Sequence, residues 1–135
     1  MSTKTAATTT GFCCCGACSV TVPLPLRDPV NCHCGQCRAL SGASFTTRVT
    51  ASREKTTISS VDDLTRFRPT ENLDRYFCKV CGTHVYTADI RLPKLYGFAA
   101  GIFDSGVVGG PTNAYFEEFR VFWECHRRAS AEGEA

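Results

Sequence analysis

Long hydrophobic runs are missing from this sequence, since no stretch approaches the roughly 18 uncharged apolar residues that a membrane-spanning helix needs. The first ten residues, MSTKTAATTT, also lack the apolar stretch of a secretory signal. These absences argue against a membrane protein and against an exported one. They predict a protein of the cytoplasm that has no membrane partner.

The sequence also lacks a large excess of positive or negative charge. The 15 Lys and Arg residues nearly balance the 13 Asp and Glu residues, which leaves a formal net charge of +2. Nucleic-acid-binding domains usually carry a much stronger basic excess. Nucleic acid is therefore not among the predicted partners, and the composition leaves the oligomeric state open.

Long helical patterns are absent too, and short strand-like runs take their place. Alternation of apolar or β-branched residues predicts strands within 20–24, 45–49 and 85–90. The glycine-interrupted run 95–103 predicts a strand that passes close to another backbone. Segment 115–123 fits helical and strand spacing equally, so its structure stays open. The predicted fold is mainly β, with several short strands.

Prolines and shifts in composition limit the regular structure. Pro23, Pro25 and Pro29 cannot donate ladder hydrogen bonds, so the first strand is predicted to lie at a sheet edge or to turn into a loop. Residues 1–10 and 127–135 are rich in small, polar or charged side chains and are predicted to be disordered. One domain over residues 11–126 remains, which is long enough for a single core.

Cysteine, by contrast, is abundant, with ten residues. Nine of them lie in three clusters, CCCGAC at 13–18, CHCGQC at 32–37 and CKVCG at 78–82. Thiols in the cytoplasm are kept reduced, so metal binding is favoured over disulfides. Two nearby cysteines followed by glycine are typical of a metal knuckle, because the short spacing directs both sulfurs to one point and glycine permits the turn.

The spacing separates a closed metal site from an open one. Zinc prefers four tetrahedral ligands, and two distant pairs of cysteines are predicted to supply them to a structural zinc: Cys13, Cys15, Cys78 and Cys81. The middle cluster offers three ligands for a second, catalytic zinc: Cys32, Cys34 and Cys37. Three protein ligands and one open position are typical of a reactive zinc. The predicted cofactors are thus two Zn²⁺ per chain.

Other side chains near these clusters have more than one interpretation. His33 lies between two ligands and is either a catalytic group for proton transfer or a structural residue. His84 is interpreted as a strand residue near the structural zinc. Three further thiols are interpreted as packing residues or free thiols: Cys14, Cys18 and Cys125. Cys14 or Cys18 would close the open site if its side chain turned toward the metal and became a fourth ligand.

In order and spacing, the seven predicted ligands resemble those of the glutathione-dependent formaldehyde-activating enzyme family, to which a domain of centromere protein V is also similar. Other motifs carry the same resemblance: Gly11-Phe12, Arg38 with Ser41-Gly42-Ala43-x-Phe45, Arg75-x-Phe77, Gly101-x-x-Asp104 and Trp123. The resemblance implies a β-tent-like fold of several small curled antiparallel sheets stapled by zinc. It also implies the same division into four structural and three catalytic ligands.

The resemblance further implies an activity. The family's proposed reaction joins glutathione, as co-substrate, to formaldehyde and gives S-hydroxymethylglutathione. We therefore expect a zinc-dependent carbon–sulfur lyase or thiol-addition enzyme, whose partners are a small thiol and an electrophile. Arg38 and Arg75 are candidate contacts for the carboxylates of glutathione, and Arg48 and Lys79 are further positive side chains in the neighbouring strands. Where many members carry a histidine, this chain has Ala114 or Tyr115, which leaves the substrate open.

Two alternatives remain beside this expectation. The same fold and open zinc could act as a Lewis acid on another substrate, in a specialised metabolite pathway. The domain could also be a zinc-stapled binding module without catalysis. This last alternative predicts an exposed apolar patch and two closed or inert metal sites.

Overall fold

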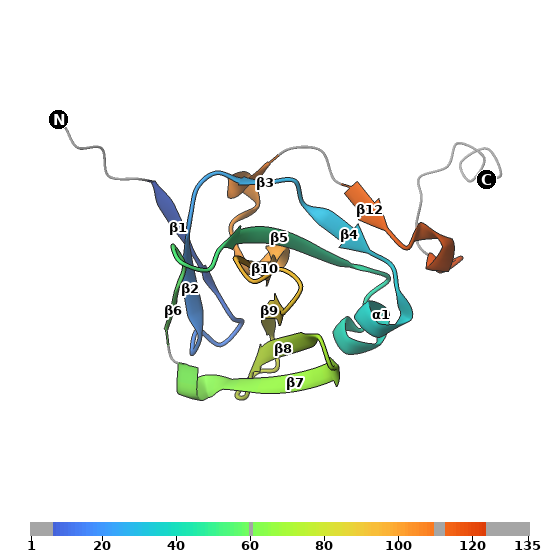
Figure 1. Ribbon diagram of the computed structural model, residues 1–135, viewed down its shortest axis with the longest axis horizontal. Helices are drawn as coiled ribbons and strands as arrows, with labels where there is room; N and C mark the ends of the chain where they lie inside the picture. Colours follow the sequence, from blue (N-terminus) through green and yellow to red (C-terminus); the bar gives the residue numbers. More distant parts are fainter. Residues whose placement is uncertain (1–6, 60, 110–112, 124–135) are drawn as a thin grey trace, which may run out of the picture.

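The computed structural model describes residues 7–59, 61–109 and 113–123 and folds them mainly into β-strands (Figure 1). Within these ranges the strands form three sheets, and the one α-helix is α1 (Gly35–Ser41). Short 3-10 turns complete the described structure: Val61–Asp63, Ala100–Ile102, Ser105–Val107 and Glu117–Phe119. None of the described helices is long and apolar enough to cross a membrane.

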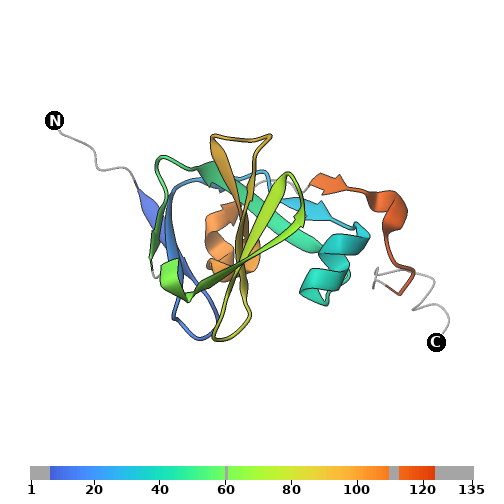
Figure 2. The same cartoon turned by 60° about the horizontal axis from the view of Figure 1, so that its bottom comes forward.

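A twisted, seven-stranded sheet forms the centre of the protein (Figures 1 and 2). In spatial order its strands are β12 (Asn113–Tyr115), β4 (Val30–Cys32), β5 (Thr46–Ser52), β10 (Leu95–Ala99), β9 (His84–Asp89), β8 (Leu73–Cys78) and β7 (Leu64–Thr70). Neighbouring strands are antiparallel, except that β12 runs parallel to β4. The helix α1 connects β4 to β5.

Two smaller sheets accompany the central one. The first is antiparallel and consists of β1 (Thr8–Phe12), β2 (Ser19–Pro23) and β6 (Thr57–Ser59), with β2 in the middle. The second is a parallel pair of two-residue strands, β3 (Leu26–Arg27) and β11 (Val108–Gly109).

The hydrophobic core joins the three-stranded sheet to the central sheet. Val20 and Val22 of β2 are buried in one cluster with Val49 of β5, Val85 of β9 and Phe98 of β10. Burial of each such side chain contributes about 1.5–3 kcal/mol. The alternation of buried residues along β2 and β5 follows the period of two that identified these strands in the sequence.

Gly11 explains how β1 approaches this core so closely. A Cβ at residue 11 would lie 2.8 Å from Ile102 Cγ1 and from the ring of Phe103. The Phe103 ring in turn packs edge-to-face on Phe98, with ring centroids 6.2 Å apart. A side chain at residue 11 would therefore push β1, and the cysteines that follow it, away from the core.

The predicted class, mainly β with several small antiparallel sheets, is confirmed. The strands predicted within 20–24, 45–49 and 85–90 correspond to β2, β5 and β9. The described structure begins its first strand at Thr8, earlier than the predicted domain start at residue 11, because β1 already pairs with Pro23 there. Residues 1–6 and 127–135 lie outside the described residues, and disorder there stays a prediction.

Of the two alternatives predicted for the proline-rich first strand, an edge position and a turn into a loop, the structure shows only the second. β2 is the middle strand of its sheet and not an edge strand. The proline is tolerated because β6 pairs only with residues 19–21, so Pro23 faces no strand on that side. Pro23 then ends β2 and the chain turns into a loop, which is the other predicted alternative. The peptide bond Leu24-Pro25 is cis.

Two further segments differ in detail from the sequence analysis. The run 95–103 is a strand only to Ala99, where a 3-10 turn begins. Its close approach occurs at Gly97, where a Cβ would lie 2.9 Å from Thr87 Oγ1, a side-chain atom and not a backbone atom. Segment 115–123 is neither one helix nor one strand, since β12 ends at Tyr115 and a single 3-10 turn follows.

Candidate metal centres

Four cysteines from two distant hairpins meet at one end of the core. Cys13 and Cys15 lie between β1 and β2, whereas Cys78 ends β8 and Cys81 lies in the turn before β9. The four sulfurs all lie within 4.8 Å of one another. Each hairpin turns at a glycine with positive φ, Gly16 at 83° and Gly82 at 81°. Glycine adopts this conformation without the strain of a side chain.

The geometry of these sulfurs fits a tetrahedral metal site. The Sγ atoms of Cys13 and Cys15 are 3.7 Å apart, and those of Cys15 and Cys78 are 3.8 Å apart. A zinc ion with Zn–S bonds of about 2.3 Å requires sulfurs about 3.8 Å apart at the corners of its tetrahedron. Backbone N–H groups stabilise the sulfurs further, since Cys18 donates to Cys13 Sγ at 3.2 Å. This group could hold a metal ion, and its donors fit zinc.

The pKa values within the four-cysteine group are unequal. Two hydrogen bonds from Thr83 lower the pKa of Cys81 to about 5; the one from its hydroxyl has the larger effect and the one from its backbone the smaller. The Ala17 backbone favours the thiolate of Cys15, but burial and the neighbouring thiols raise the pKa of Cys15 to about 12. The Cys81 thiolate therefore forms readily near neutral pH, whereas a bound cation would be needed to ionise Cys15.

The second group of cysteines surrounds the start of α1. Cys32 ends β4, Cys34 caps the helix and Cys37 lies in its first turn. The backbone N–H of Cys37 donates to Cys34 Sγ at 3.3 Å, so the helix cap itself brings two sulfurs together. The three sulfurs lie within 4.8 Å of one another, and no fourth His, Cys, Asp or Glu of the described residues joins them. This group could hold a metal ion and offers it three ligands.

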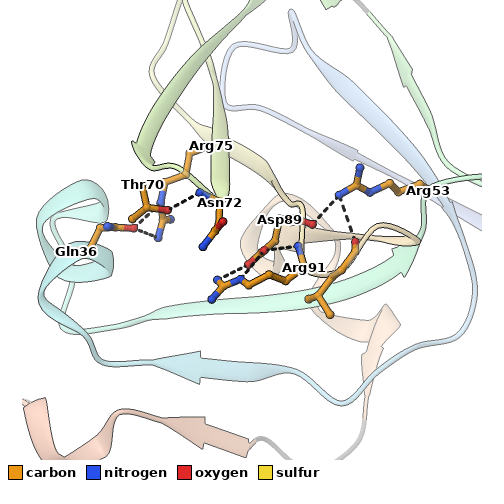
Figure 3. A network of polar contacts seen from close by, with 8 residues as sticks. Gln36, Arg53, Thr70, Asn72, Arg75, Asp89 and Arg91 are labelled. Carbon is orange, nitrogen blue, oxygen red and sulfur yellow. Dashed lines mark hydrogen bonds and ion pairs between the residues drawn. The ribbon is translucent and has the colours of Figure 1, made fainter.

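Arg75 on β8 is buried against this three-cysteine group. Its Nη2 donates to Cys37 Sγ at 3.5 Å, and its Nε and Nη2 donate to Gln36 Oε1 at 3.2 and 2.9 Å. Figure 3 shows Gln36 on α1 directed toward the guanidinium of Arg75. Only 5% of Arg75 is exposed, so this cation is fixed in position and its charge is poorly screened.

The cation changes how the second group ionises. Burial opposes ionisation of Cys37, but the neighbouring Thr46 hydroxyl, the Arg75 guanidinium and the Cys32 thiol outweigh it and lower the pKa of Cys37 to about 7. Burial and the neighbouring thiols raise the pKa of Cys32 to about 12. Cys37 therefore ionises before Cys32.

A cavity of about 290 Å³ lies beside the three-cysteine group. Thr46 and Arg75, which contact Cys37, also line this cavity, as does His84 of β9. The sheet register explains the hollow, because Thr87 and Gly97 are small residues that pair between Arg75 on β8 and Thr50 on β5. Because Thr87 and Gly97 are small, they leave room beside longer side chains such as that of Arg75.

The structure separates the three side chains predicted for substrate chemistry. Arg75 lies at the cavity, whereas Arg38 lines a different hollow with Trp123 and donates from Nε to the His33 carbonyl at 3.2 Å. The His33 ring is almost fully buried and packs on Phe45, with ring centroids 4.9 Å apart. Phe45 lines the cavity, so His33 lies behind the cavity wall.

Two residues of this site carry no clear signal in the sequence, Gln36 and Thr46. Gln36 orients Arg75, and Thr46 lines the cavity. The one signal that could have found either of them is the position of Gln36 inside the second cysteine cluster. Arg48, one of the positive side chains that the sequence places near the zinc, also lines the cavity. His84 is a strand residue, as predicted, and lines the cavity as well.

The remaining thiols divide into a buried one and an exposed one. Cys18 is buried, and its Sγ lies 3.6 Å from the Asp63 carbonyl. Burial raises the pKa of Cys18 to about 12, which fits a packing residue. Cys14 is exposed. Cys125 lies outside the described residues.

Comparisons with known proteins cover most of the chain. The family model described as "Glutathione-dependent formaldehyde-activating enzyme" matches residues 8–124. A crystal structure of a Rhodobacter sphaeroides protein is similar to this fold with a TM-score of 0.61, and it is 23% identical over 78% of this chain and 99% of that chain. No curated protein matches this sequence significantly.

Proposed function

Because this chain belongs to the glutathione-dependent formaldehyde-activating enzyme family, we propose that it adds the sulfur of glutathione to a small aldehyde such as formaldehyde. In this reaction a carbon–sulfur bond forms, and the thiol proton is transferred to the carbonyl oxygen. In the reverse direction the protein acts as a carbon–sulfur lyase, which breaks the same bond and returns the proton to sulfur.

The observation that carries this proposal is the position of the three-cysteine group directly behind Thr46 and Arg75, two residues that line a cavity and contact Cys37. Zinc bound by Cys32, Cys34 and Cys37 would supply an open position for a thiol sulfur and stabilise its anionic form. Arg75 fixes Cys37 and adds a positive charge on the same side. Phe45 and Tyr86 add aromatic side chains to the lining of the cavity.

Proton transfer needs a group that reaches the cavity. His84 lines it, and burial together with the charge of Arg75 lowers the pKa of His84, so its imidazole is neutral at pH 7. A neutral imidazole can accept the thiol proton and return it to the carbonyl oxygen. The catalytic role predicted for His33 and the substrate contact predicted for Arg38 stay predictions.

The four-cysteine group has a structural role in this proposal. Its two pairs join the loop between β1 and β2 to the hairpin of β8 and β9. Zinc at both groups gives two ions per chain, and a closed set of four thiolates contributes to folding and leaves no position for substrate. The cytoplasmic location stays a prediction.

A second candidate function, a zinc-stapled binding module, is favoured by one observation. Large aromatic side chains are exposed at the end of the described chain: Tyr115, Phe116, Phe119, Phe122 and Trp123. Such a patch is typical of interaction surfaces. This module would retain the four-cysteine group but would need no cavity at the three-cysteine group.

Magnetisation-exchange NMR tests the proposed function. The experiment measures how fast glutathione and formaldehyde interconvert with their hydroxymethyl adduct, with and without zinc-loaded protein. We expect acceleration by the wild type and by Cys14→Ser, whose thiol is exposed and belongs to neither group. Cys34→Ser should lose the acceleration while its NMR spectrum stays folded. Equal rates with and without wild-type protein would contradict the enzymatic function.

A further inference from the structure

The cavity beside the three-cysteine group adjoins two others. It shares Arg75 and His84 with a cavity of about 460 Å³ on the side of β7 and α1. It shares Arg48, Thr87 and Gly97 with a cavity of about 210 Å³ that extends toward β12. Because neighbouring cavities share these lining residues, the three lie side by side as one groove across β5, β10, β9 and β8. Such a groove is larger than a small aldehyde needs, and it suits an extended ligand.

The charged side chains of this groove differ in what they already bind. Arg75 is occupied by Gln36 and Cys37. Asp89 is paired with Arg91, whose Nη2 lies 2.7 Å from Asp89 Oδ2 (Figure 3). Arg48 and Arg66 are different, since neither guanidinium forms a hydrogen bond or ion pair with the residues that the structure describes. Of these two, Arg48 lines the cavity beside the three-cysteine group, whereas Arg66 lines the cavity on the side of β7 and α1.

The sheet holds Arg48 on the open face of the groove. Val49 and Ala51 of β5 point into the core, so Arg48 and Thr50 point to the opposite face. The side chain of Arg48 lies over Gly97, where a Cβ would be 3.5 Å from Arg48 Cδ. Arg48 also acts electrostatically on Cys37, His84 and Asp89, so its charge is felt in both cavities that it lines.

We propose that Arg48 binds a carboxylate of an extended, peptide-like thiol whose sulfur lies at the three-cysteine group. This inference rests on the proposed function and adds to it the residue that distinguishes glutathione from small neutral thiols. A guanidinium fits a carboxylate because two parallel N–H groups can donate to its two oxygens. Arg48 is a binding residue in this account and takes no part in the proton transfer.

Binding measurements on zinc-loaded protein test the proposal with three probes. The probes are glutathione, its dimethyl ester, in which both carboxylates are masked, and 2-mercaptoethanol, which has none. We expect Arg48→Gln to bind glutathione about 10- to 100-fold more weakly than wild type, which is the usual effect of losing a charged hydrogen bond. Wild type should bind the ester as weakly as Arg48→Gln binds glutathione. Binding of 2-mercaptoethanol should be equal in both proteins.

Two further variants serve as controls for charge and folding. Arg68→Gln removes the same charge from the surface of β7, where Arg68 pairs with Asp74 outside the groove, and should bind glutathione like the wild type. Arg48→Lys keeps the charge and should recover part of the affinity. Equal binding of glutathione by Arg48→Gln and wild type would overturn the role of Arg48 and leave the proposed function intact. No binding of glutathione by the wild type would overturn both.

Discussion

The Nη2 atom of Arg75 lies 3.5 Å from the sulfur of Cys37, and both residues are buried. β8 supplies the cation and α1 supplies the thiol, so two separate parts of the chain must be correctly folded for this contact to exist. Gln36 holds the same guanidinium through its amide oxygen. Arg75 is therefore a positioning residue that couples the three-cysteine group to the cavity.

Substitution of Arg75 should impair the reaction more than substitution of its supporting residue. Arg75→Met keeps much of the side-chain volume but removes the cation, and we expect kcat/KM to fall about 10- to 100-fold. Gln36→Ala should lower kcat/KM by a smaller factor, because Arg75 keeps its contact with Cys37. Exchange rates at several glutathione concentrations measure both effects. Equal losses of kcat/KM in the two variants would contradict this order.

His84 should control how the rate depends on pH. Its pKa lies below the ordinary value of 6.5, because the side chain is half-buried and Arg75 is positive. The wild-type rate should therefore persist as the pH falls to 6.5 and decline only below it. His84→Gln should lose about 100-fold or more in rate, as expected when a general base is removed. A wild-type profile that declines well above pH 6.5 would contradict the assignment.

The same histidine should contribute to the pH dependence of stability. Its pKa is lower in the folded state than in the unfolded state, so the unfolded state binds more protons between the two values. This contribution is fully present above pH 6.5 and is lost as the pH falls through the folded pKa. Urea denaturation between pH 5 and 7 should show a smaller loss of unfolding free energy in His84→Gln than in wild type.

Loss of a ligand should affect the two cysteine groups differently. Cys78→Ser opens the group that joins two hairpins, so we expect a loss of several kcal/mol in unfolding free energy. Cys34→Ser should lose the reaction at a much smaller cost in stability, because its group lies within a single segment of the chain. Thermal unfolding and metal analysis of both variants measure this difference. A larger loss of stability in Cys34→Ser than in Cys78→Ser would contradict these two roles.

Gly97 should tolerate no side chain. An alanine Cβ would lie 2.9 Å from Thr87 Oγ1, so Gly97→Ala should cost about 1–3 kcal/mol, as is usual for overpacking. The double variant Gly97→Ala with Thr87→Ala removes the clashing hydroxyl and should recover part of this loss. Urea denaturation measures both values. Full stability of Gly97→Ala alone would contradict the close packing at this position.

The sequence predicted the metal groups better than the cavity beside them. Ligand pairs such as Cys78 and Cys81 are local in sequence, and their spacing with Gly82 limits the geometry they can adopt. The cavity instead depends on sheet register, which places Thr87 between Arg75 and Gly97. No local pattern encodes that row, because its residues come from three strands.

The helix α1 and the strand β2 show two other limits of the sequence. α1 has seven residues, too few for a clear helical period, and its first turn is set by the cap at Cys34. Pro23 is compatible with the central position of β2 because β6 is short: it begins at Thr57, opposite Thr21, and has no residue opposite Pro23. A proline excludes a ladder partner at its own position but does not determine whether its strand is central.

X-ray absorption at the zinc edge tests most directly whether the three-cysteine group is an open site for a thiol. With four sulfurs at one zinc and three at the other, the average is about 3.5 sulfurs per zinc. We expect glutathione to raise this average to about 4 sulfurs per zinc, the limit set by four-coordinate sites. The ester should do so only at higher concentration. An average of four sulfurs before any thiol is added would show a closed site and contradict the account.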